Sequence, residues 1–109
     1  MTFSFYVPRE GDAGPDAWAT NEERAAAVRE VRRLEARYPG FIRNTTRSLE
    51  LMLPPHAERV TAACPARDAV LPLYLEDDHF TTPFCCYGND VDCARCGAWI
   101  VFHLAARME

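Results

Sequence analysis

The sequence contains no lysine and no long apolar run. All twelve basic residues are arginine, and sixteen acidic residues bring the formal net charge to −4. No basic patch is concentrated enough to release many counterions from a nucleic acid, so the charge argues against a nucleic-acid surface. No apolar stretch approaches the ~20 residues that span a bilayer, which argues against a membrane protein.

A secretory signal is also lacking. The N-terminal sequence MTFSFYVPREGD has neither a basic start nor a long apolar stretch. A reducing cytoplasm is therefore the default compartment, where clustered cysteines more often serve metal or redox chemistry than disulfide bonding. The chain has five cysteines, so a pure disulfide framework would leave one thiol over. A disulfide pair stays an alternative if the protein is exported by another route.

The first part of the chain has the pattern of a β/α unit. Thr2 to Val7 is apolar and β-prone, which predicts a strand. Thr20 and Glu23 form a capping box that opens a helix through Tyr38. Phe41-Ile42 then predicts a short second strand. Strand, helix and strand in this order predict a βαβ unit with parallel strands. Such a unit cannot cover its own sheet edges, so the rest of the chain or another polypeptide must pack on it.

The remaining residues predict short helices, a hairpin and a last helix. Asn44 or Thr45 can cap a helix that runs to residues 51–53, and a second short helix is predicted at 56–63. Residues 70–75 and 80–86 predict the strands of a β-hairpin around a four-residue acidic turn. Residues 97–108 predict a helix, although the apolar sequence WIVFHL would also suit a buried strand.

The length of 109 residues favours a single domain of modest core. The residue pattern of the chain changes at Cys64-Pro65. This change divides the chain into a β/α segment at 1–63 and a cysteine-rich segment at 64–109. The expected fold class is α+β, with a partial β/α unit followed by a cysteine-rich β-hairpin and a C-terminal helix.

The cysteines are the main functional signal. Cys93-x-x-Cys96 places two thiolates on one side of a tight loop. The predicted hairpin brings its two ends together, so Cys64 should meet Cys85 and Cys86. Four thiolates are what a tetrahedral zinc site and a [4Fe–4S] cluster both require. Adjacent strand residues face opposite sides, so only one of Cys85 and Cys86 is expected to be a ligand.

Other interpretations of the same residues are weaker. A buried cysteine such as Cys64 can be a small core residue. A thioredoxin-like redox motif belongs at a helix N-terminus after a strand, whereas Cys93 follows an irregular acidic loop. We expect His79 in an exposed turn and His103 in the core rather than as ligands. No Ser/His/Asp arrangement, phosphate-binding glycine loop or metalloprotease helix is present.

A resemblance to one known family rests on two parts of the chain. The first part is Cys64-Pro65 with VLPLYLEDDHFTTPFCCYGNDVDCARCGAW, ending in Asp92-Cys93-x-x-Cys96-Gly97. It resembles the C-terminal SPASM/twitch extension of radical S-adenosylmethionine (radical SAM) proteins, where a hairpin and loop carry cysteines for an auxiliary [4Fe–4S] cluster. More loosely, FSFYVPREGD and YPGFIRN are similar to the last β/α units of the partial barrel in those proteins.

The resemblance implies a ligand set and also a limit. By position it implies that Cys64, Cys85, Cys93 and Cys96 hold the auxiliary cluster, with Cys86 in reserve. The Cys-x-x-x-Cys-x-x-Cys motif that holds the S-adenosylmethionine-cleaving cluster is absent, and 109 residues cannot supply six β/α units. The resemblance therefore implies a detached C-terminal piece that is not catalytic alone.

Two roles follow as expectations. The first is an iron–sulfur module that transfers electrons or anchors a substrate, together with a separately encoded radical SAM barrel or an electron donor. The second is a structural zinc module that serves folding or protein interaction and has no redox role. Thiolate count does not separate them, because both metals accept four sulfurs.

Overall fold

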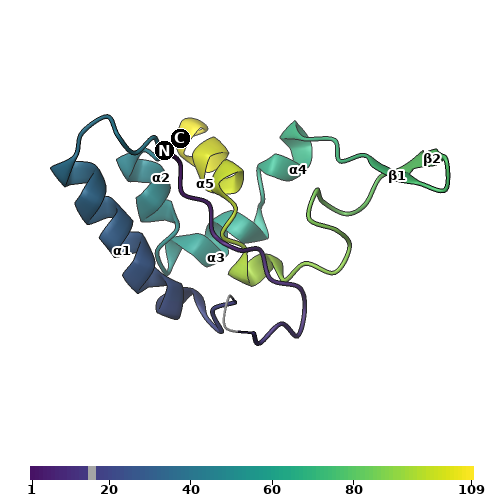
Figure 1. The fold of residues 1–109 in the computed structure, drawn as a ribbon, viewed down its shortest axis with the longest axis horizontal. Coiled ribbons are helices and arrows are strands. Elements are labelled where there is room, and N and C mark those ends of the chain that lie inside the picture. The colour runs from purple at the N-terminus through teal and green to yellow at the C-terminus, as the bar shows by residue number, and fades with distance from the viewer. Residues whose placement is uncertain (15–16) are drawn as a thin grey trace.

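Helices are the main regular elements of the structure, a computed structural model that describes residues 1–14 and 17–109 (Figure 1). The helices are α1 (Asn21–Arg37), α2 (Thr46–Leu51), α3 (His56–Ala62), α4 (Ala66–Ala69) and α5 (Trp99–Arg107), with a 3₁₀ turn η1 (Cys93–Arg95). Two antiparallel strands, β1 (Tyr74–Glu76) and β2 (His79–Thr81), form a hairpin that projects away from the helices (Figure 1). The described residues therefore make a mixed α+β fold.

Helix α1 begins and ends where the sequence predicts. The Thr20 hydroxyl accepts a hydrogen bond from the Glu23 backbone N–H at 3.2 Å, and the Glu23 carboxylate accepts one from Ala19 N–H at 3.0 Å. The helix ends at Tyr38, whose N–H still bonds to a helix carbonyl. Val28, Val31 and Tyr38 belong to an apolar stripe that recurs every three to four residues in the sequence and predicts one buried helix face. Val28 and Val31 are buried as expected, whereas Tyr38 is 51% exposed and lies outside the core.

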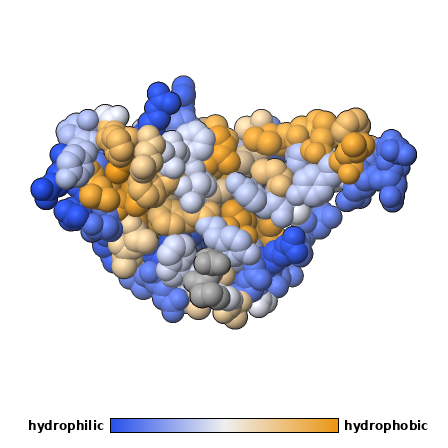
Figure 2. Space-filling model, in the orientation of Figure 1, coloured by the Kyte–Doolittle hydropathy of each residue, from blue (hydrophilic) through white to orange (hydrophobic). Residues whose placement is uncertain are grey.

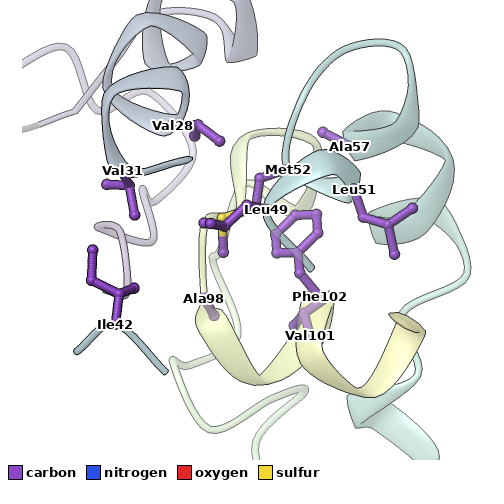
Figure 3. Packing of buried hydrophobic residues seen from close by; sticks show 10 residues of the cluster. All are labelled: Val28, Val31, Ile42, Leu49, Leu51, Met52, Ala57, Ala98, Val101 and Phe102. Carbon is purple, nitrogen blue, oxygen red and sulfur yellow. The ribbon is translucent and has the colours of Figure 1, made fainter. Parts of the chain in front are cut away.

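The core lies where α2 and α5 pack together beside α1 and α3. Figure 3 shows Phe102 of α5 pointing toward Leu49 of α2. Both side chains are fully buried, and each such burial contributes about 1.5–3 kcal/mol. The cluster comprises Val28, Val31, Ile42, Leu49, Leu51, Met52, Ala57, Ala98, Val101 and Phe102. It draws on residues before and after Cys64, so the segments 1–63 and 64–109 share one core, and the division between them stays a prediction.

The predicted βαβ unit is wrong, because its two segments form no strand. Residues 1–3 lie beside residues 41–44, joined by two backbone hydrogen bonds of Met1 and by the side chain of Asn44. Its amide oxygen accepts from Phe3 N–H at 2.8 Å and its amide nitrogen donates to the Phe3 carbonyl at 2.9 Å. Asn44 is buried, so one side chain satisfies backbone groups that a second strand would otherwise pair.

The N-terminal segment continues along the loop that carries the last cysteines. Phe5 N–H donates to the Gly97 carbonyl at 2.9 Å, and Arg9 forms a single antiparallel bridge with Val91. Partners some ninety residues apart cannot be inferred from strand–helix–strand order, which is why the sequence predicted a parallel neighbour instead.

The predicted hairpin is confirmed, with shorter strands and a tighter turn. Leu75 lies opposite Phe80, and the turn is Asp77-Asp78, with φ of 46° and 68°. Positive φ at both central residues is the two-residue turn that suits right-twisted strands, and aspartate tolerates it better than most residues. The four-residue turn expected from the sequence therefore contains the last residue of β1 and the first of β2.

The predictions for the other helices hold. Thr45 caps α2 by accepting from Ser48 N–H at 3.1 Å, α3 begins at His56, and the apolar C-terminal run is the helix α5. Helix α4 and the turn η1 were not predicted. Within residues 1–14 and 17–109, no helix has the length and apolarity needed to cross a membrane.

Candidate metal centre

All five cysteines line one cavity, between the end of α3, the base of the hairpin and η1. The space open to the centre of a water-sized sphere is about 70 Å³, several times the ~10–15 Å³ that one water needs. Its other walls are mainly apolar and include Val7, Val70, Phe84, Val91, Ile100 and Val101. The structure thus brings the five predicted site residues together, and their role as ligands stays a prediction.

The Cys93–Cys96 pair is held in a single 3₁₀ turn. Cys96 N–H donates to the Cys93 carbonyl at 3.1 Å. The side chain of Arg95, the last residue of this turn, holds it in place. Its Nε donates to the Asp92 carboxylate at 2.7 Å, and its Nη1 donates to the Trp18 carbonyl at 3.0 Å. Nη1 and Nη2 also reach carbonyls of the loop that precedes α1. One largely covered arginine therefore ties the cysteine turn to the N-terminal part of the chain.

Cys85 and Cys86 lie in a turn rather than on a strand. Cys85 and Gly88 exchange two backbone hydrogen bonds at 3.3 and 2.9 Å, and Gly88 has a φ of +116° that favours glycine. The prediction that Cys85 and Cys86 face opposite sides of a strand is therefore wrong, and both line the cavity. Their surroundings still differ: Cys85 is half-buried and its Sγ accepts from Tyr87 N–H at 3.3 Å, whereas Cys86 is exposed.

Burial raises the pKa of several of these thiols. It raises the pKa of Cys96 to about 11, and the charge that a neighbouring Cys64 thiolate would carry adds to the effect. Burial is also the largest cause that raises the pKa of Cys93 and of Cys86, and Cys85 adds to both. The thiols therefore act on one another electrostatically, and a metal would have to displace their protons to bind.

His79 lies in an exposed turn as expected, whereas His103 is half-buried beside the core rather than in it, and its Nδ1 has no hydrogen-bond partner among the described residues. The ring of His103 stacks on Trp99 within α5 with 4.7 Å between centroids. Over residues 1–14 and 17–109, no three His, Cys, Asp or Glu side chains form a ready single-ion site.

Sequence reasoning missed the arginines around the cysteines. Arg24 is 1% exposed and its Nη1 donates to the Arg95 carbonyl at 2.9 Å. Arg67 borders the cavity with its guanidinium 4.5 Å from the centroid of the Phe84 ring. A signal for Arg24 was present, because it lies four residues before Val28 on the buried face of α1.

The arrangement gathers five thiols around one mainly apolar cavity. Scans against protein-family models, curated proteins and solved structures found no match for this chain.

Proposed function

We propose that this chain binds one [4Fe–4S] cluster through Cys64, Cys85, Cys93 and Cys96. The observation that carries the proposal is that cysteines from separate stretches of the chain line the same cavity. Four thiolates are the usual ligand set of this cluster. The cavity is also larger than a single ion requires, and its mainly apolar wall would shield a cluster from solvent.

Cys85 is the proposed fourth ligand in preference to Cys86. The Tyr87 N–H already points at the Cys85 sulfur, and a hydrogen bond to a ligating sulfur holds it in place for the metal. Cys86 is the more exposed of the two and would serve as a reserve ligand.

The role proposed for the cluster is electron transfer or substrate anchoring, in the cytoplasm and without independent enzymatic activity. This follows the resemblance to SPASM/twitch extensions and the absence of a Cys-x-x-x-Cys-x-x-Cys motif in the sequence. The substrate chemistry would belong to a separately encoded radical SAM barrel or to a redox partner.

The hairpin supports docking to such a partner. Apolar residues gather along the edge from α4 to the hairpin (Figure 2), and Leu71 is 74% and Phe80 70% exposed. A contiguous exposed apolar surface marks an interaction site, and a two-stranded hairpin is marginally stable unless something packs on it. A separately encoded protein that covers this surface would stabilise the hairpin that leads to Cys85.

A structural zinc site is the second candidate function. The observation in its favour is that residues 64–97 contain only short elements, none longer than α4 with four residues. Regions of this kind commonly take their folding free energy from a four-thiolate zinc.

Anaerobic expression with iron and sulfide tests both. The cluster predicts a brown protein with about four irons per chain, and Cys93→Ser should lose them. A colourless protein that holds one zinc would replace the first proposal by the second. A protein that retains neither metal after reconstitution would overturn both.

A further inference from the structure

Arg24 carries a buried charge that no carboxylate pairs. It lies in the first turns of α1, and no described carboxylate forms an ion pair with it. Glu58 is its nearest acidic influence, but that side chain is at the surface and accepts from Asn21 at 2.8 Å. A buried cation without a counter-charge is strongly unfavourable, so the position calls for an anion nearby.

The guanidinium lies against the backbone that carries Cys96. Nη1 donates to the Arg95 carbonyl at 2.9 Å, while Nη2 reaches the Met52 carbonyl at 3.5 Å. On the other side of Cys96, a Cβ added at Gly97 would lie 2.8 Å from Nη1. The arginine is thus packed against the residues before and after Cys96, and glycine at 97 is what allows that approach.

Within the described part of the chain, the hydrogen bonds of Arg24 leave part of its guanidinium without a partner. Nε of Arg24 has no hydrogen-bond partner among the described residues, so carbonyl contacts satisfy only part of the guanidinium.

We propose that Arg24 is the counter-charge of the cluster and raises its reduction potential. The inference rests on the proposed function. A four-thiolate cluster is an anion, and accepting one electron from an external donor makes it more negative by one charge. A fixed cation behind Cys96 stabilises the reduced form more than the oxidised form, because net charge and surroundings set cluster potentials.

A matched pair of substitutions separates charge from packing. Arg24→Lys keeps the cation and Arg24→Gln removes it, while both shorten the side chain and lose guanidinium hydrogen bonds. The full chain is reconstituted anaerobically with iron and sulfide and titrated with dithionite under spectroscopic observation. We expect Arg24→Gln to lower the midpoint potential by at least 59 mV, a tenfold change in the reduced-to-oxidised ratio for one electron, and Arg24→Lys to stay near the parent protein.

Arg67→Gln is the control, because Arg67 also borders the cavity but is exposed. Water screens its charge, so a smaller shift is expected than for Arg24→Gln. Circular dichroism of the metal-free variants reports whether each one folds.

The outcomes are distinct. Equal potentials in all loaded proteins, or equal shifts in Arg24→Lys and Arg24→Gln, would overturn the inference while leaving the cluster proposal intact. Loss of folding in both Arg24 variants would likewise overturn it in favour of a packing role. Folded Arg24→Gln that cannot retain iron, beside Arg24→Lys that can, would support the counter-charge. A parent protein that holds no cluster would overturn the proposed function and the inference with it.

Discussion

Cys85 and Cys86 are neighbours in the chain with different surroundings. Cys85 is half-buried with a backbone N–H on its sulfur, and Cys86 is exposed. We expect Cys85→Ser to lose most of the bound metal and Cys86→Ser to retain it, because only the first removes a preorganised ligand. Metal per chain, measured after gel filtration, checks this. Equal losses would show that both sulfurs bind or that neither does.

Phe102 provides a test of the core at a single residue. It is fully buried between α5 and α2, so Phe102→Ala should lower the free energy of unfolding by about 3–5 kcal/mol. Phe80→Ala is the matched control, since Phe80 is exposed on the hairpin and its loss should change stability by no more than about 0.5 kcal/mol. Urea unfolding of both variants measures the difference. Similar effects would contradict the position of the core.

At the scale of elements, the turn η1 depends on Arg95. Its side chain joins Asp92, which caps the turn, to the carbonyls of Arg9, Asp12 and Trp18. Arg95→Leu should weaken metal binding by about 10–100-fold, as expected for a residue that orients ligands without being one. Competition with a chelator measures the affinity. The exposed Arg9→Leu is the control, and a helix content unchanged by circular dichroism would separate this effect from unfolding.

The end of α5 is joined to α2 by Arg47 and Glu109. The arginine donates to both Glu109 oxygens at 2.7 Å, and this hydrogen bonding lowers the pKa of the Glu109 carboxyl. A carboxyl with a lowered pKa stabilises the fold above its ordinary pKa, and the stabilisation is lost as the pH falls through the folded-state pKa. Glu109→Gln should therefore be less stable than the parent near neutral pH and equal to it at strongly acidic pH. Thermal unfolding at several pH values tests this sign.

Sequence patterns predicted the elements whose signals are local. The Thr20 cap and the stripe through Val28 predicted α1, and the two β-prone runs predicted the hairpin. The strands predicted at residues 2–7 and 41–42 are absent. The N-terminal segment instead forms backbone hydrogen bonds with the side chain of Asn44 and with the distant Gly97. Such pairings depend on the whole fold and leave no periodic signal in the segment itself.

For the whole molecule, we expect a bound metal to stabilise the cysteine segments more than the helical core. The core of α1, α2 and α5 is apolar and needs no metal, whereas residues 64–69 and 85–97 are held by few regular elements. We expect chelation to remove hydrogen-exchange protection around the cysteines and to leave α1 and α2 protected. Mass spectrometry of exchange measures this region by region. The same treatment of Cys93→Ser should change nothing, and loss of protection throughout would contradict a separately stable core.

The sequence predicted the residues that line the cavity better than it predicted the N-terminal segment, where the expected parallel sheet is absent. The spacing of Cys93 and Cys96 and the hairpin before Cys85 were enough to expect these residues in one region, and they line the same cavity. The sequence could not predict which of Cys85 and Cys86 is better placed, because their surroundings depend on a turn closed by Gly88. Arg24 and Arg95 were also missed, because a charged residue in a sequence is expected at the surface unless its partners are known.

The pairing of Phe5 with Gly97 has a consequence for the order of folding. Contacts between distant residues form slowly, because the intervening chain must first be brought together, whereas the hydrogen bonds within a helix join residues only four apart. We therefore expect the helices to form before the N-terminal segment closes over residues 90–97. Until that step the cysteines would remain open to solvent, which leaves an interval in which a cofactor can be delivered before the cavity is completed.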